Sequence, residues 1–130
     1  MGIEVVSEVT DEVLEATDRL IPQLSSSAPK MTREELEAFL AQPGVYVFAF
    51  RADGPILGML TLVTFTIPTG HRGIIEDVVV DADARGHGAG QALVEAALQM
   101  GRDFSPQPRS RQPPLSPLRI RTQGDKRLPL

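Results

Sequence analysis

The segment Ile74–Gly90 reads I-I-E-D-V-V-V-D-A-D-A-R-G-H-G-A-G, and it predicts a strand that leads through a glycine-rich turn into a helix. Its first half is mostly β-branched, which is typical of a strand. Gly86, Gly88 and Gly90 allow a positive φ and remove Cβ atoms that would keep a ligand away. Successive backbone N–H groups can then converge on an anion at the positive end of the helix dipole. We therefore predict a phosphate-binding loop, with Arg85 adding positive charge at its mouth.

Two well-known phosphate loops do not match this segment. A Rossmann fingerprint needs G-x-G-x-x-G, but Gln91 stands where the third glycine should be. A Walker loop needs G-K-[ST], which is absent from the segment. The remaining alternative to a phosphate loop is a tight glycine turn that only starts a helix.

The rest of residues 1–102 gives clear signals for strands and helices. Thr10 can cap a helix that Pro22 ends or kinks, and Thr32 with Glu35 forms a capping box for a second helix. The expected order is β-α-α-β-β-β-α, an α/β fold of the α+β type with a mostly antiparallel sheet flanked by helices. The expected strands are Ile3–Val9, Val45–Arg51, Ile56–Ile67 and Ile74–Val80, and the last helix is Gly86–Arg102.

With its preceding strand, V-V-V-D-A-D-A-R-G-H-G-A-G resembles the acetyl-CoA motif of the GNAT superfamily of N-acetyltransferases, a strand followed by R/Q-x-x-G-x-G/A opening a helix. The strand E-D-V-V-V is also found in many bacterial relatives, so a bacterial protein is expected. The resemblance covers residues 3–102, and we assign residues 1–102 to an incomplete GNAT-like domain. It implies acetyl-CoA as co-substrate and transfer of an acetyl group to a primary amine.

The resemblance also implies where acetyl-CoA is held. The backbone of Val78 and Val80 would pair with the pantetheine arm. The residues expected around the diphosphate are Arg85, Gly86, His87, Gly88, Ala89 and Gly90.

The acidic pair Glu76 and Asp77 contains the candidates for the catalytic base. Amine acetylation needs a deprotonated amine, and a nearby carboxylate can take its proton directly or through water. Adjacent residues of a strand point to opposite faces, so we expect one of the two to face the substrate. The resemblance favours Glu76, with Asp77 as the alternative. A carboxylate that is solvated, or that pairs with Arg72, is the structural alternative.

Other titratable residues give weaker signals. His71 in a turn and His87 in the glycine loop could titrate near neutral pH, but loop histidines are commonly only exposed side chains. Tyr46 is the single tyrosine, and its place on a strand favours packing. No arrangement of residues predicts a metal site.

Residues 103–130 form a basic, proline-rich tail that we expect to be irregular. Residues 1–100 carry 15 acidic and 6 basic side chains, whereas residues 101–130 carry 2 acidic and 7 basic ones and 6 of the 11 prolines. GNAT proteins continue here with further strands, and we expect these to be missing, which would leave the edge of strand Ile74–Val80 exposed. If the tail codons are shifted by one base, they can encode A-N-R-L-Y followed by G-F, which resembles the terminal GNAT motif. We therefore interpret the tail as out-of-frame sequence, and the domain as truncated.

Composition limits the remaining choices. The chain has no cysteine, hydrophobic residues make up 42% and charged residues 23% of it, and no apolar run suits a membrane span. We expect a cytoplasmic acetyltransferase without nucleic-acid or membrane partners. It is expected to act on a small-molecule or peptide amine, and the truncation can make it inactive. A non-catalytic acyl-CoA-binding or interaction protein is the alternative. The acceptor is left open, as is the oligomeric state, for which the resemblance allows a homodimer.

Overall fold

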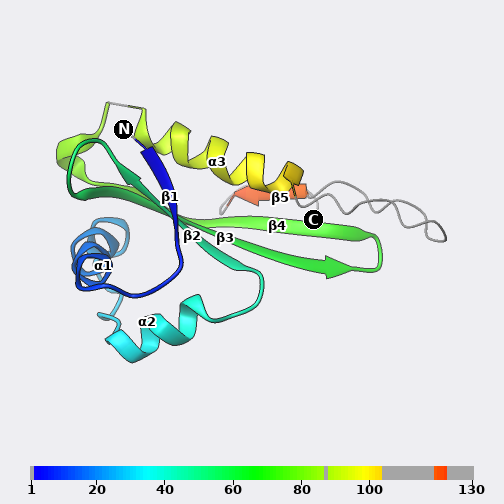
Figure 1. The fold of residues 1–130 in the computed structure, drawn as a ribbon, viewed down its shortest axis with the longest axis horizontal. Helices are drawn as coiled ribbons and strands as arrows, with labels where there is room; N and C mark the ends of the chain where they lie inside the picture. Colours follow the sequence, from blue (N-terminus) through cyan, green and yellow to red (C-terminus); the bar gives the residue numbers. More distant parts are fainter. Residues whose placement is uncertain (1, 87, 104–118, 123–130) are drawn as a thin grey trace.

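The computed structural model describes residues 2–86, 88–103 and 119–122, and it centres on one five-stranded sheet (Figure 1). The strands lie in the order β1-β2-β3-β4-β5. Neighbours among the first four strands are antiparallel, whereas β5 runs parallel to β4. The expected mostly antiparallel sheet is therefore confirmed. The strand bounds are β1 Gly2–Val6, β2 Val45–Arg51, β3 Ile56–Ile67, β4 Gly70–Val80 and β5 Arg119–Thr122.

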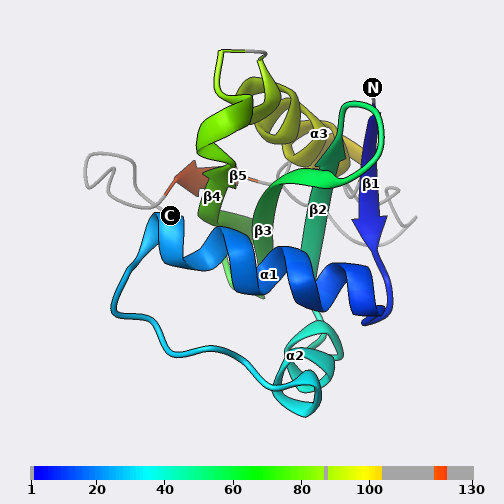
Figure 2. The same ribbon diagram turned by 90° about the vertical axis from the view of Figure 1, so that its left-hand side faces the viewer.

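Helices cover both faces of this sheet. Helices α1 (Asp11–Leu24) and α2 (Arg33–Leu40) lie on one face, and α3 (Ala89–Asp103) lies on the other (Figures 1 and 2). Alternation along β3 serves both sides, because Met59 packs into the core beneath α1 and Leu60 into the core beneath α3. The sheet is consequently buried on both faces, which explains why β2 and β3 are so apolar.

Local signals begin both N-terminal helices as expected. The Thr10 hydroxyl accepts a hydrogen bond from the Val13 N–H at 3.1 Å and caps α1. Thr32 and Glu35 form the complete predicted capping box at the start of α2. Pro22 does not end α1, which continues to Leu24. Because Pro22 lies in the last turn, it removes only one N–H donor near the end of the helix.

The predicted strands β2 and β3 have the observed bounds, and the other elements differ at their ends. The first strand ends at Val6 rather than Val9, and β4 begins at Gly70 rather than Ile74. The last helix begins at Ala89 rather than Gly86, since Gly86 and Gly88 have φ values of 94° and 76° that no right-handed helix contains.

The prediction that no strand follows residue 102 is wrong at β5. Arg119–Thr122 pairs in parallel with Arg72–Ile75 of β4. This segment has no proline, unlike the residues before it, so its N–H groups can satisfy the edge of β4 that would otherwise be open. The predicted irregularity of the remaining tail falls on residues 104–118 and 123–130, which lie outside the described residues.

Candidate active site

A β-bulge interrupts β4 directly after Glu76, so that it includes the second residue of the acidic pair. Met59 of β3 faces Val79 and Thr61 faces Glu76, so two residues of β4, Asp77 and Val78, stand opposite one residue of β3. Asp77 has a φ of 53°. Aspartate is one of the few residues that adopts this left-handed conformation at low cost, because its short side chain can hydrogen-bond locally. The bulge therefore changes the direction in which the Asp77 carboxylate leaves the sheet.

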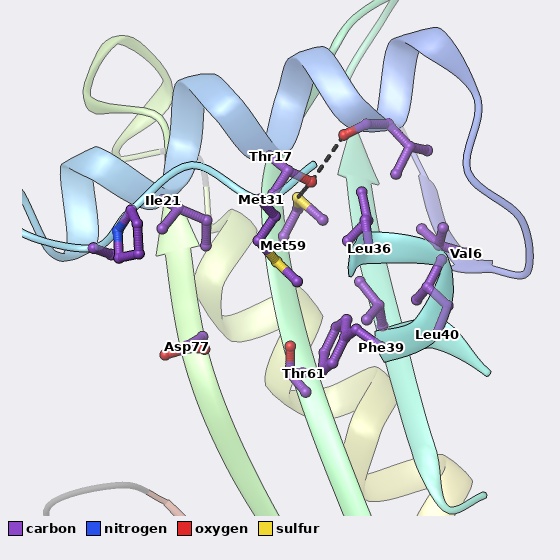
Figure 3. A pocket seen from close by; sticks show the side chains of 14 residues that line it. Val6, Thr17, Ile21, Met31, Leu36, Phe39, Leu40, Met59, Thr61 and Asp77 are labelled. Carbon is purple, nitrogen blue, oxygen red and sulfur yellow. Dashed lines mark hydrogen bonds between the residues drawn. The ribbon is translucent and has the colours of Figure 1, made fainter. Parts of the chain in front are cut away.

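The bulge overturns the prediction that Glu76 and Asp77 point to opposite faces. Asp77 lines a cavity on the α1 side of the sheet, and so does Thr61 (Figure 3). Glu76 is the cross-strand partner of Thr61, and directly paired residues share a face. Both carboxylates consequently belong to the α1 face. Strict alternation fails here because the bulge inserts one extra residue into the strand.

The cavity lies between the sheet and helices α1 and α2, and its volume is about 320 Å³. Asp77 is the only charged residue that lines it in the described part of the chain, and Thr17 and Thr61 are the only other polar ones. The Thr17 hydroxyl already donates to the Val13 carbonyl oxygen at 2.8 Å. The apolar lining consists of Val6, Val13, Ile21, Ala28, Pro29, Met31, Leu36, Phe39, Leu40, Val47 and Met59.

The glycine loop follows the C-terminal end of β4, the end that also holds Asp77, and it lies between the 3₁₀ turn η1 (Ala82–Ala84) and α3. A Cβ placed on Gly86 or Gly88 would meet no described atom within 4 Å, so the loop borders open space. The Gly88 carbonyl accepts the first helical hydrogen bond, from the Ala92 N–H at 2.9 Å. The N–H groups of the first turn of α3 then have no intrahelical acceptor. His87 lies outside the described residues.

The outer edge of β4 is paired with β5 only in its first half. The last described pair is Ile75 with Thr122. On the other edge, the Asp81 N–H donates to the Leu57 carbonyl oxygen at 2.8 Å. Because backbone groups alternate in direction along a strand, those of Val78 and Val80 point toward the outer edge. Among the described residues, the part of β4 after Ile75 thus has no partner strand on its outer edge, and this part leads to the glycine loop.

An ion pair joins α1 to the turn before the loop. The Arg19 guanidinium donates to Asp81 Oδ2 at 2.5 Å and to the Ile56 carbonyl oxygen at 2.7 Å. Asp81 Oδ1 also accepts from the Asp83 N–H at 3.1 Å. The Asp83 N–H, followed by the Arg19 guanidinium, lowers the pKa of Asp81, and partial burial opposes the shift. Bonds to Glu15 first, then to Asp81, raise the pKa of Arg19.

The sequence did not single out Arg19 or Asp81. Gln23 strengthens the same connection, since its side-chain oxygen accepts from the Ala82 N–H at 2.8 Å. A Glu15–Arg19 pair at helical spacing is visible in the sequence, but a contact between residues 62 positions apart is not.

The other candidate residues lie away from the cavity. His71 is part of β4 rather than of a turn, and its Nδ1 lies 2.8 Å from the Thr66 hydroxyl. Tyr46 packs against the core beneath α3, as predicted. Arg72 is buried and donates to the His71 carbonyl oxygen and the Thr69 hydroxyl.

Within the described ranges, no group of three or more His, Cys, Asp or Glu residues could hold a metal ion. Among the helices that the structure describes, none is both long and apolar enough to cross a membrane.

Comparisons with known proteins agree with this geometry. Residues 12–106 match the family described as "Acetyltransferase (GNAT) family". An aminoglycoside acetyltransferase from an uncultured soil metagenomic sample, in complex with sisomicin, has 22% identity and a TM-score of 0.74, with 97% of this chain and 78% of that chain covered. Ribosomal-protein-alanine N-acetyltransferase from Brucella melitensis has 19% identity and a TM-score of 0.64, with 98% and 84% covered. A transcriptional regulator from Bacillus halodurans has 17% identity and a TM-score of 0.71, with 97% and 84% covered. No curated protein matches the chain.

Proposed function

Because the chain belongs to the acetyltransferase (GNAT) family, we propose that it is an acetyl-CoA-dependent N-acetyltransferase that acts on a primary amine. The observation that carries this proposal is that the open glycine loop lies beside the outer edge of β4. Backbone N–H groups at a helix N-terminus suit a diphosphate, and a free strand edge suits the amide groups of a pantetheine arm. The carboxylates on the α1 face of the same strand then adjoin the place where the thioester would end.

The residues proposed to hold acetyl-CoA come from two segments. Val78 and Val80 would offer backbone groups to the pantetheine arm. Positive φ values at Gly86 and Gly88 leave room for phosphate oxygens where a side chain would intrude. The diphosphate would lie against Arg85, Gly86, Gly88, Ala89 and Gly90.

In the reaction, the nitrogen of the neutral amine attacks the carbonyl carbon of the thioester. A C–N bond forms and the C–S bond breaks, so the products are an amide and the CoA thiol. The amine nitrogen gives up one proton to a base, and the departing sulfur gains one. Acetyl-CoA supplies the activated acyl group, and the protein supplies orientation and proton transfer.

We assign the two carboxylates different roles. Glu76 takes the proton of the attacking amine, directly or through a water molecule. Asp77, which lines the cavity, attracts the ammonium form and holds it in place before deprotonation. The bulge makes this division workable, since two adjacent carboxylates can serve one substrate only if they share a face of the sheet.

Thermal unfolding with and without acetyl-CoA tests the loop. We expect a rise in Tm for the wild type and none for Gly88→Glu, whose carboxylate would occupy the diphosphate site. Gly54→Glu is the matched control, because Gly54 also has a positive φ and open space around its Cα, but lies in the β2–β3 turn. A rise in Tm that survives Gly88→Glu would contradict the loop assignment.

Release of thiol from acetyl-CoA in the presence of amines tests the activity. The outcome expected of an enzyme is amine-dependent release that Gly88→Glu removes. Binding of acetyl-CoA without turnover of any amine would instead identify a non-catalytic acyl-CoA-binding protein.

A further inference from the structure

The cavity beside the bulge carries information about the acceptor, and the following inference rests on the proposed function. We propose that the acceptor is a primary amine with a single positive charge on a compact apolar body. Neither a polyhydroxylated amine with several charges nor a polar peptide N-terminus fits the cavity walls. The charge, the chemistry and the size of this cavity all favour such an amine.

Charge is the first constraint. Asp77, which is exposed at the open side of the cavity, carries the one charge on the described cavity wall, and the cavity is otherwise almost entirely apolar. Of the two carboxylates on this face, Asp77 lines the cavity and can neutralise one ammonium group, while Glu76 takes the proton of that same group. A second ammonium group inside the cavity would face only apolar side chains and would lose its hydration without compensation. The site therefore selects against polycationic amines.

Hydrogen-bonding capacity is the second constraint. The Thr17 hydroxyl donates to the backbone carbonyl of Val13, which commits its hydrogen. Thr61 and Asp77 are then the polar side chains best able to meet a ligand. A body with many hydroxyl or amide groups would leave most of them unpaired, and unpaired buried polar groups cost affinity. An aromatic or aliphatic body suits these walls better.

The arrangement of the lining residues gives the amine a direction. Figure 3 shows Asp77 on β4 at one end of the cavity, and Val6 and Leu40 at the other. Phe39 lies between them, near Thr61. An amine nitrogen held at Asp77 would lie on the strand that borders the proposed acetyl-CoA site, with its body directed toward β1 and α2. This direction presents the nitrogen, rather than the body, to the thioester.

Size is the third constraint. A volume of about 320 Å³ lies at the lower end of the range for small-molecule pockets, about 300–1,000 Å³, so the cavity suits a small amine. An arylalkylamine such as 2-phenylethylamine has this size, one ammonium group and an apolar body. An aminoglycoside is several times larger and carries several ammonium groups.

The experiment compares 2-phenylethylamine, kanamycin and an alanine-first peptide, with the full chain and acetyl-CoA. We expect kcat/KM, followed by thiol release, to be at least tenfold higher for 2-phenylethylamine than for the other two. Calorimetric titration with 2-phenylethylamine gives a readout that does not need turnover. Preference for kanamycin or for the peptide would overturn the inference and leave the acetyltransferase proposal intact. Absence of both acetyl-CoA binding and thiol release would overturn the proposed function itself, while amine binding would still be measured.

Variants of the lining residues distinguish specific binding in the cavity from nonspecific hydrophobic binding. Asp77→Asn removes the charge and keeps a residue that adopts the left-handed conformation, and we expect it to weaken 2-phenylethylamine binding at least tenfold. Asp53→Asn makes the same change in the exposed β2–β3 turn and should leave Kd unchanged. Phe39→Ala widens the cavity and should raise the kcat/KM ratio of 2-(1-naphthyl)ethylamine to 2-phenylethylamine severalfold. Equal binding by Asp77→Asn and wild type would refute the inference.

Discussion

Replacement of Arg19 by alanine should lower both the stability of the fold and the affinity for acetyl-CoA. The Arg19 side chain is 29% exposed, and its partners differ strongly: Asp81 is 13% exposed and Glu15 60% exposed. An exposed pair at helical spacing contributes about 0.3–0.5 kcal/mol. Charged hydrogen bonds to partly buried acceptors contribute about 1.5–3 kcal/mol before the remaining exposure is discounted. We therefore expect Arg19→Ala to lower the free energy of unfolding by about 2 kcal/mol.

Matched variants show which bond matters. Asp81→Asn keeps an oxygen that can accept from the Asp83 N–H but loses the charge that faces Arg19, and we expect a loss of about 1 kcal/mol. Glu15→Gln should cost less than about 0.5 kcal/mol, although Glu15 has the larger effect on the pKa of Arg19. The burial of the partner, rather than its effect on the pKa of Arg19, governs how much stability is lost when the bond is removed.

The measurements are urea unfolding followed by circular dichroism, and calorimetric titration with acetyl-CoA. For a chain of this length, 2 kcal/mol corresponds to a fall in Tm of about 6–8 °C. Because the ion pair fixes the turn before the glycine loop, we expect Kd for acetyl-CoA to rise about fivefold to tenfold in Arg19→Ala. Equal destabilisation by Glu15→Gln and Asp81→Asn would refute the argument from burial. An unchanged Kd would refute the connection between α1 and the loop.

Three further predictions concern the base, the response to acid and the tail. Glu76→Gln should lower kcat at least a hundredfold and change Kd for 2-phenylethylamine by less than threefold, as measured by steady-state kinetics and titration; a kcat near that of the wild type would move the role of base to Asp77. The lowered pKa of Asp81 stabilises the fold above about pH 4, and this contribution is lost as the pH falls further and the carboxylate is protonated. The unfolding free energy of the wild type should therefore fall more steeply between about pH 5 and pH 3 than that of Asp81→Asn, and parallel curves would contradict the assignment. Nucleotide sequencing should find that the codons for residues 103–130, read in the neighbouring frame, encode A-N-R-L-Y followed by G-F, and any other codons would exclude the frameshift.

Much of the fold was predictable because its signals are local. Apolar, β-prone runs on either side of the turn-forming residues Asp53-Gly54-Pro55 define β2 and β3, and the structure gives the predicted bounds. The capping box at Thr32 needs only a side chain three residues away, so it could also be recognised in the sequence. The resemblance of the glycine segment led to the family to which the chain belongs.

The missed features depend on the pairing of distant segments. The bulge at Asp77 arises from the register between β3 and β4. The residue types around Asp77 do not predict this register. The Arg19–Asp81 pair joins positions that only the folded sheet brings together. In the same way, β5 exists because four residues without proline meet an edge that needs partners, which cannot be read from a segment of four residues alone.

Helix α1 has two tasks, and this has a consequence for protein engineering. Thr17 and Ile21 line the cavity, while Arg19 and Gln23 reach toward the turn before the glycine loop. One inserted residue would rotate everything after it by about 100° and displace both sets of contacts together. The length of α1 should therefore be invariant among homologous enzymes. Libraries that aim at new substrates should leave α1 untouched and vary Met31 and Phe39, which line the cavity from outside α1.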